Sequence, residues 1–380
     1  MFKKKRYFLS LVIFLSLGLN AEDSFIRSIF PVVNSLFASG PGAVDVADLD
    51  GDTYPDLVTS NVNTNNVSVL LNNGSGAFPS AVNFDTGASP FSLVLGDVNN
   101  DTYIDIVTAN LGGDSASVLL GNGDGTFDTA VDYGTDLLSA GLTLSDVDGD
   151  TYLDLLVANL IGGNVSVLIN NGDGTFATAV NYATGFGALS VSAGDVNGDT
   201  YIDMVVSNLL DGNFSVLLNN NDGTFGTATN YSMPDGAYDI QLVDVDGVDG
   251  LDVITAHGNS DYILVSLNNG DGTFATGVDY TSGPGPRSIN FGDVNGDTYS
   301  DIAAVNSSDE SVSVFINNGN GTFASAVSYD AGSGPFSVVI RDVNGDTYPD
   351  IEIAIAFEDS IGVLFNNNDG TFDDIVKYDI

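Results

Sequence analysis

The stretch DVNGDTYIDMVVSN, residues 195–208, joins a short acidic loop to an apolar run, and related copies of it fill most of the chain. The copies begin at seven aspartates spaced 49 residues apart: Asp48, Asp97, Asp146, Asp195, Asp244, Asp293 and Asp342. Seven phenylalanines keep the same spacing: Phe78, Phe127, Phe176, Phe225, Phe274, Phe323 and Phe372. A fixed period of this length is typical of repeat architectures, in which each unit buries its faces against its neighbours.

The hydrophobic pattern of each unit predicts four short strands and no helix. In the second unit these strands cover about residues 91–95, 105–110, 117–120 and 130–133, which are rich in Val, Ile, Leu and Tyr. Several runs are apolar on both sides, as expected for sheets that are covered on each face. The sequence therefore predicts an all-β fold, a seven-bladed β-propeller of four-stranded antiparallel blades over residues 38–380. A solenoid is the alternative, but a unit of four antiparallel strands fits a blade better.

The first residues are typical of an export signal. A basic start, Lys3 to Arg6, precedes an apolar run over residues 7–19, and Ala21 offers a small residue for cleavage. That run is shorter than the roughly 20 residues of a membrane-spanning helix. We therefore predict a signal peptide at residues 1–21 and a secreted protein, extracellular or at the cell surface, with the periplasm or a retained N-terminal anchor as alternatives.

Two segments compete to close the ring. Residues 29–35, within the N-terminal segment 22–37, fall in the register of residues 78–84, and residues 373–378 fall in the same register at the other end. Either segment is a candidate outer strand of the closing blade. If the N-terminal copy pairs there, strand exchange between the termini closes the ring.

The charge of the chain excludes several classes of partner. Its formal net charge is −43, and only Arg27, Arg287, Arg341 and Lys377 are basic beyond the predicted signal. Nucleic acids and anionic membranes bind through Lys and Arg, so we expect neither as a partner, and no membrane insertion after signal cleavage. The absence of cysteine excludes disulfides, thiolate metal sites and a cysteine nucleophile.

The acidic loops carry oxygen side chains at positions 1, 3, 5 and 9, and most copies have glycine at position 4. Calcium takes about six to eight oxygen ligands, which a tight loop can supply from alternate side chains and one main-chain carbonyl. The carbonyl of position 7 is the expected backbone ligand. Without a metal, these carboxylates would repel one another. Solvated Asp-Gly turns are the alternative, but such turns do not require an aspartate at position 9.

The sequence thus predicts structural Ca²⁺ in six or seven loops. The expected ligands are Asp48, Asp50, Asp52, Tyr54 and Asp56; Asp97, Asn99, Asp101, Tyr103 and Asp105; Asp146, Asp148, Asp150, Tyr152 and Asp154; Asp195, Asn197, Asp199, Tyr201 and Asp203; Asp244, Asp246, Asp249 and Asp252; Asp293, Asn295, Asp297, Tyr299 and Asp301; Asp342, Asn344, Asp346, Tyr348 and Asp350.

The fifth loop departs from this pattern. Val248 stands at position 5, Asp249 follows it, and Gly250 replaces the tyrosine. We expect this site to be either rearranged, with Asp249 as a ligand, or empty. In the second loop Asn100 replaces glycine, but asparagine tolerates the left-handed conformation, so that site is expected to bind.

A second motif, NNGDGTF ending at Phe176, recurs between the third and fourth strands. Asn-Gly and Asp-Gly steps favour tight hairpins, so we interpret the motif as a turn whose phenylalanine anchors the outer strand between blades. An independent metal site in this turn is the less favoured alternative.

The acidic loop after the first strand of each blade, combined with the period, resembles the FG-GAP and VCBS repeats, which are related to the calcium-binding blades of integrin α-subunit heads. The resemblance covers residues 38–380, although the FG and GAP signatures survive only in pieces near residues 333–342. It implies a calcium-binding propeller. Such propellers serve in adhesion, in lectins and as non-catalytic parts of enzymes, so the resemblance names no ligand.

No catalytic constellation is identifiable, and we expect the chain not to be an enzyme. The single histidine, His257, stands where other units have asparagine at the end of the second strand, which indicates a structural position. Carboxylate pairs are too frequent to identify a glycosidase site. A polysaccharide lyase or hydrolase is the enzymatic alternative.

The strand order places the acidic loops and the Asn-Gly hairpins on one face of the ring. The opposite face carries residues that break the repeat and suit recognition: Tyr238, Tyr262, Arg287, Glu310, Phe357 and Glu358. We therefore predict a secreted, monomeric, calcium-stabilised binding or adhesion module for a protein or glycan ligand. A lectin-like or carbohydrate-processing protein and a purely structural surface component are the other hypotheses.

Overall fold

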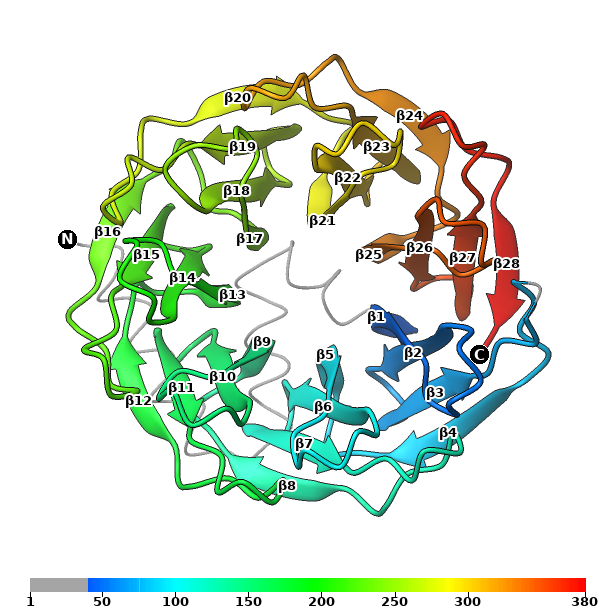
Figure 1. Ribbon diagram of the computed structural model, residues 1–380, viewed down its shortest axis with the longest axis horizontal. Coiled ribbons are helices and arrows are strands. Elements are labelled where there is room, and N and C mark those ends of the chain that lie inside the picture. Colours follow the sequence, from blue (N-terminus) through cyan, green and yellow to red (C-terminus); the bar gives the residue numbers. More distant parts are fainter. Residues whose placement is uncertain (1–39, 75) are drawn as a thin grey trace, which may run out of the picture. The chain divides into compact units, whose positions relative to one another are not determined.

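The computed structural model describes residues 40–74 and 76–380, which form a ring of seven four-stranded blades (Figure 1). The predicted all-β propeller and its number of blades are confirmed. Across the described part of the chain, no helix has the length and hydrophobicity to cross a membrane. The predicted signal peptide and the segment 22–37 lie outside the described residues.

Every blade consists of four strands that follow one another in the sequence. Blades 1 to 4 contain β1 (Pro41–Ala47), β2 (Asp56–Asn61), β3 (Asn66–Leu70), β4 (Ala81–Asp85), β5 (Pro90–Gly96), β6 (Asp105–Asn110), β7 (Ser115–Leu119), β8 (Val131–Gly134), β9 (Ser139–Ser145), β10 (Asp154–Asn159), β11 (Asn164–Leu168), β12 (Val180–Ala183), β13 (Ala188–Gly194), β14 (Asp203–Asn208), β15 (Asn213–Leu217) and β16 (Thr229–Ser232). Blades 5 to 7 contain β17 (Asp239–Val243), β18 (Asp252–His257), β19 (Tyr262–Ser266), β20 (Val278–Thr281), β21 (Pro286–Gly292), β22 (Asp301–Asn306), β23 (Ser311–Phe315), β24 (Val327–Asp330), β25 (Pro335–Arg341), β26 (Asp350–Ile355), β27 (Ser360–Leu364) and β28 (Val376–Asp379).

The C-terminal candidate is the outer strand of blade 7, because β28 pairs with β27 from Ser360↔Asp379 to Val363↔Val376. The competing segment, residues 29–35, lies outside the described residues. Side-chain contacts join blade 7 to blade 1: the Tyr378 hydroxyl donates to the Gly76 carbonyl at 2.8 Å, and its ring packs against Phe78. Within the described chain, the ring is therefore closed by packing between complete blades.

The core lies between blades. All six residues of every second strand are buried, which confirms sheets that are covered on both faces. Alternate side chains of β26 pack toward different neighbours: Ile351 and Ile353 contact blade 6, and Ala354 contacts blade 1. Because side chains alternate across a strand, each blade contributes to two inter-blade cores.

Side chains at the starts of the innermost strands of different blades contact one another. The Phe91 ring of blade 2 packs edge-on against Phe336 of blade 7 at 5.5 Å, and the Arg287 guanidinium lies 3.9 Å from the Phe336 ring centre. Tyr238 lies 5.5 Å from the same guanidinium. Tyr238 and Arg287 are each only 7% exposed, so these two departures from the repeat are buried and do not lie on the exposed surface.

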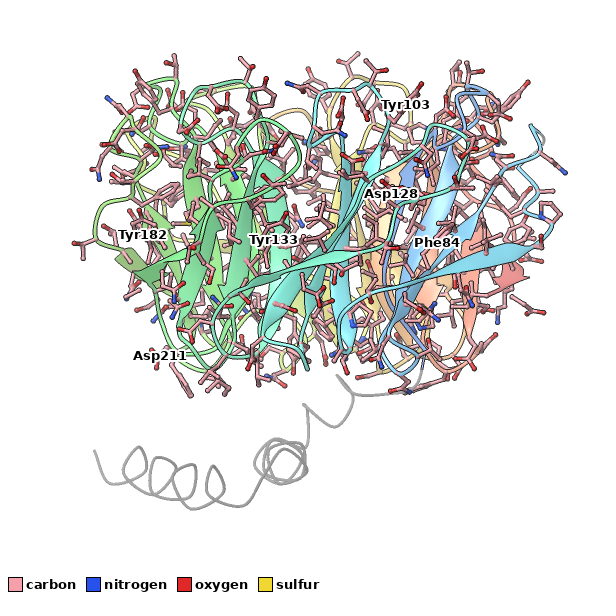
Figure 2. The ribbon with its side chains drawn as sticks, turned by 90° about the horizontal axis from the view of Figure 1, so that it is seen from below. Phe84, Tyr103, Asp128, Tyr133, Tyr182 and Asp211 are labelled. Atoms are coloured by element: carbon pink, nitrogen blue, oxygen red, sulfur yellow. The ribbon has the colours of Figure 1, made fainter. Side chains whose placement is uncertain are left out.

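The two faces of the ring are distinct (Figure 2). Tyr103, in the second acidic loop, lies at one face, and Asp211, in the loop between β14 and β15, lies at the other. We call them the acidic face, with the acidic loops and the Asn-Gly hairpins, and the crossover face, with the second-to-third-strand loops and the connections between blades. This division agrees with the prediction.

Candidate metal centres

Backbone N–H groups hold the side chains of each acidic loop in place. In the first loop the two oxygens of Asp48 accept from the N–H groups of Gly51 (2.8 Å) and Thr53 (2.9 Å). Asp52 accepts from the N–H of Tyr54 at 2.9 Å. Gly51 and Thr53 have φ values of 77° and 76°, so the loop twice enters the left-handed region and curls around its own carboxylates.

Three carboxylates converge in the first, third and fifth loops, where oxygens of positions 1, 3 and 9 lie within 4.8 Å of one another. The groups are Asp48, Asp50 and Asp56; Asp146, Asp148 and Asp154; Asp244, Asp246 and Asp252. Each group could hold a metal ion, and its all-oxygen donor set suits a hard cation. The position-5 residues Asp52 and Asp150 stand outside these groups and accept from the N–H of position 7.

The other four loops have asparagine at position 3, which offers one amide oxygen. In the sixth loop Asn295 accepts from the N–H of Asp297 at 2.9 Å, as Asp50 accepts from the N–H of Asp52 in the first loop at 3.2 Å. Amide oxygens also bind calcium, so these loops keep a usable donor with one negative charge fewer.

The aspartate at position 9 has a second role that the sequence analysis missed. Asp56 is fully buried. Its two oxygens accept from the N–H groups of Leu49 (2.8 Å) and Asn72 (2.7 Å). The same pair of bonds recurs in every blade, at Asp105, Asp154, Asp203, Asp252, Asp301 and Asp350. Position 9 therefore ties the acidic loop to the hairpin beside it.

Burial shifts the titration of these aspartates. It raises the pKa of Asp350 to about 7, and the negative charges of Asp346 and Asp342 add to the shift, against two backbone hydrogen bonds that lower it. The pKa values of the other six are raised to about 6: Asp56, Asp105, Asp154, Asp203, Asp252 and Asp301. A cation bound beside them would favour the ionised form.

The fifth loop brings together positions 1, 3 and 9, although its sequence departs from the repeat. Val248 is 54% exposed and offers no oxygen side chain. The side chain of Asp249 packs against Gly270 of the neighbouring hairpin. In the first blade the ring of Tyr54 takes the equivalent place over Gly74. Asp249 thus replaces the tyrosine ring spatially, and its role as a ligand stays a prediction.

The hairpin motif forms the predicted turn, and its first asparagine also serves as a clamp between blades, a role that the sequence did not predict. In blade 6 the Asn317 side chain donates to the carbonyls of Val245 in blade 5 (2.9 Å) and Ser300 in its own acidic loop (3.1 Å), and accepts from Gly319 N–H. Equivalent residues are Asn72, Asn170, Asn219, Asn268 and Asn366. Six of the seven acidic loops are thereby held by the next blade. Blade 2 has Gly121 at this position, and there the Gly125 N–H donates to the Leu49 carbonyl of blade 1.

His257 lies in a buried polar network of blade 5. Its Nε2 is 2.8 Å from the Thr255 hydroxyl, its Nδ1 is 2.8 Å from Asp235, and its ring stacks on Tyr262. Burial lowers the pKa of His257, against the pull of the Asp235 charge. The Thr255 hydroxyl that contacts the imidazole is fully buried, and Ser260 donates to Asp235 rather than to the imidazole.

The ring of four-stranded blades and its oxygen-rich loops define a β-propeller with repeated candidate metal centres. The chain belongs to the FG-GAP-like repeat family, whose model matches residues 48–108, 97–157, 146–206, 244–304 and 293–351. The predicted FG-GAP resemblance is confirmed. Comparison with curated proteins finds no match.

Several solved structures share the fold. An Agrocybe aegerita lectin that recognises non-reducing terminal N-acetylglucosamine is 23% identical, with 77% of this chain and 80% of that chain covered and a TM-score of 0.56. Virginiamycin B lyase from Staphylococcus aureus is 12% identical, with coverages of 86% and 95% and a TM-score of 0.59. The V. cholerae biofilm matrix protein Bap1 is 12% identical, with coverages of 90% and 81% and a TM-score of 0.53. At these identities the likeness concerns the fold alone.

Proposed function

We propose that the protein is an exported, calcium-stabilised binding module without catalytic activity, which presents its crossover face to a protein or glycan. The observation that carries the calcium role is the convergence of three carboxylates at positions 1, 3 and 9 of a loop. The rigid ring supports the binding role, because recognition loops are commonly carried on such scaffolds. The low content of Lys and Arg disfavours nucleic acid as the partner.

Calcium should stabilise the folded protein, because an ion that binds only the folded state adds about 2.7 kcal/mol per site at 100 times its Kd. Extracellular sites often have a Kd of about 10⁻⁴–10⁻³ M, so millimolar calcium is the relevant range. Differential scanning calorimetry in excess chelator and in millimolar calcium should show a higher melting temperature in calcium. Equal melting temperatures would contradict the calcium role.

The fifth loop should bind most weakly, since Val248 removes the oxygen of position 5. Anomalous diffraction from calcium-soaked crystals would compare the occupancy of all seven loops. Full occupancy of the fifth loop at subsaturating calcium, equal to the others, would refute this ranking.

The binding role is tested on an array of glycans and matrix proteins, with and without calcium. Exposed apolar side chains on the crossover face are the first candidates for contacts: Phe357 is 58% exposed, Leu137 44% and Phe186 42%. Truncation of a true hot spot to alanine should weaken binding by about 1–2 kcal/mol or more and leave calcium-dependent melting unchanged. A purified protein that depolymerises a glycan would replace the binding role with an enzymatic one.

A further inference from the structure

A cavity of about 510 Å³ opens between blades 5 and 6, beside their outer strands. β20 and the connection after it form one wall, and β23, β24 and residues 323–326 form the other. β20 and β24 are successive outer strands of the ring (Figure 1). The volume lies within the range of small-molecule sites, about 300–1,000 Å³.

A departure from the repeat accounts for space at this place. Ser313 and Ser328 face each other across β23 and β24. In blades 1 to 4 the residue at the position of Ser328 is asparagine or aspartate, and its Oδ1 accepts the hydroxyl of the facing serine at 2.6–2.8 Å. The shorter side chain of Ser328 fills less of the space between the strands.

The same departure leaves a buried donor. Ser313 is 1% exposed, and its oxygen accepts from the Asn306 amide (2.9 Å) and from the Gly283 N–H (3.1 Å). Both lone pairs are thus used, and among the described residues no acceptor takes the Ser313 proton. Because Ser313 lines the cavity, an oxygen atom of a ligand can accept this proton.

The remaining lining selects the kind of ligand. Hydroxyls of Thr281, Ser325 and Ser328 and the carboxylates of Asp279 and Asp309 line the cavity, and no Lys or Arg does. A ligand with several hydroxyls can donate to the carboxylates and accept from the serines. An anionic ligand would be repelled by the two aspartates and by the net charge of the chain.

We propose that this cavity binds one neutral pyranose sugar. The proposal deepens the binding role proposed above and rests on it. It places the sugar beside the outer strands and next to the crossover face, because Asp309 belongs to the loop before β23 and residues 282 and 283 belong to the connection between blades 5 and 6.

The test is a saturation-transfer difference NMR titration of the calcium-loaded protein with D-glucose, D-galactose, D-mannose, N-acetylglucosamine and, as the anionic counterpart, D-glucuronate. At least one neutral sugar should show saturable binding, and glucuronate should bind at least tenfold more weakly than that sugar. Ser328→Asn restores the side chain of the other blades, should refill the cavity and give Ser313 its acceptor, and should weaken sugar binding at least tenfold. Thr229→Asn, at an exposed position of β16, is the matched control and should bind as the wild type does.

Three results would overturn the proposal: no neutral sugar saturates, Ser328→Asn binds like the wild type, or glucuronate binds as well as the best neutral sugar. Melting temperatures of both variants in calcium establish that they are folded. If array ligands bind the protein while Ser328→Asn leaves sugar binding unchanged, the sugar cavity is refuted and the general binding role stands. If the melting temperature does not change with calcium while sugar binding depends on Ser328, the metal role is refuted and the sugar site in the cavity is supported.

Discussion

The buried aspartate of position 9 combines two roles that one substitution can separate. In blade 6, Asp301 accepts from the N–H groups of Val294 (3.1 Å) and Asn317 (2.8 Å). Asp301→Asn replaces one acceptor oxygen by an NH₂ group that faces a buried N–H. We expect a loss of about 1–3 kcal/mol in the free energy of unfolding, even in chelator.

Asp297→Asn is the matched control in the same loop, because Asp297 is exposed at position 5. Urea unfolding in chelator should show a clearly smaller loss for Asp297→Asn than for Asp301→Asn. In millimolar calcium both variants should lose stability relative to the wild type. Equal losses in chelator would mean that the hydrogen bonds of Asp301 do not stabilise the loop.

His257 makes blade 5 sensitive to acid. Its pKa is lowered from 6.5 by burial, so the folded protein keeps it neutral where the unfolded chain already binds a proton. Its contribution to stability is therefore present above about pH 6.5 and is lost as the pH falls toward the lowered pKa, at no more than about 1.4 kcal/mol per pH unit. His257→Asn introduces the asparagine that other blades have at this position, and it should remove this pH dependence of stability.

Urea unfolding of the wild type and of His257→Asn at pH 7.5 and pH 5.5 measures this effect. At pH 5.5 the free energy of unfolding of the variant should rise relative to that of the wild type. The contributions of the acidic residues that both proteins share cancel in this difference. A difference that is the same at both pH values would show that His257 does not titrate between the folded and unfolded states.

At the residue scale, the sequence predicted which positions carry oxygen but not what each oxygen does. The recurrence of position 9 pointed to a metal ligand, whereas its burial and its two N–H partners appear only when the hairpin lies beside the loop. Arg287 and Tyr238 were expected on a recognition surface. A departure from a repeat does not indicate whether the side chain is exposed, and both of these side chains are buried against each other.

Among the elements, the hairpin clamp carries the clearest test. Asn317→Ala removes three side-chain hydrogen bonds, one of them to the Val245 carbonyl of blade 5, which then keeps only the Gly321 N–H as a donor. We expect the free energy of unfolding to fall by about 1–3 kcal/mol. Its neighbour Asn318, which bonds the Thr322 hydroxyl on the surface, gives the control variant Asn318→Ala with a much smaller effect.

Denaturant unfolding of both asparagine variants in calcium provides the measurement. If Asn318→Ala costs as much as Asn317→Ala, the hairpin owes its role to turn geometry and not to the clamp between blades.

Strand positions were predictable because the period repeats each of them seven times. In the second unit the predicted strands differ from β5, β6, β7 and β8 by at most two residues at any end. The clamp was not predictable. Asn317 and Val245 lie 72 residues apart, and a local turn motif does not reveal which other blade its side chain reaches.

For the whole molecule, closure by packing has a direct test. By register, Ile380 matches Thr86 and Gly40 matches Ser89, so a two-residue linker like Gly87–Ala88 would reproduce the connection between blades 1 and 2. A circular permutant joined in this way and opened within residues 86–89 should fold and keep the calcium-dependent melting temperature. The control permutant, opened inside the β26–β27 loop with the same linker, breaks a blade and should be less stable.

Calorimetry compares the two permutants with the unpermuted chain over residues 40–380. If only the first permutant fails to fold, the contact between blades 7 and 1 requires free chain ends at its present position.

The same closure determines how the propeller would respond to a pulling force. Gly40 accepts from Val62 N–H and Ile380 donates to the Asp359 carbonyl, so both ends of the described chain lie on the crossover face in blades 1 and 7. We expect tension between them to act on the contacts of Tyr378 with Gly76 and Phe78 and to open the ring there first. The remaining blades then lie in series, and each one that gives way releases 49 residues, about 160–175 Å of extended chain. Under load the molecule would lengthen in successive steps of nearly equal size.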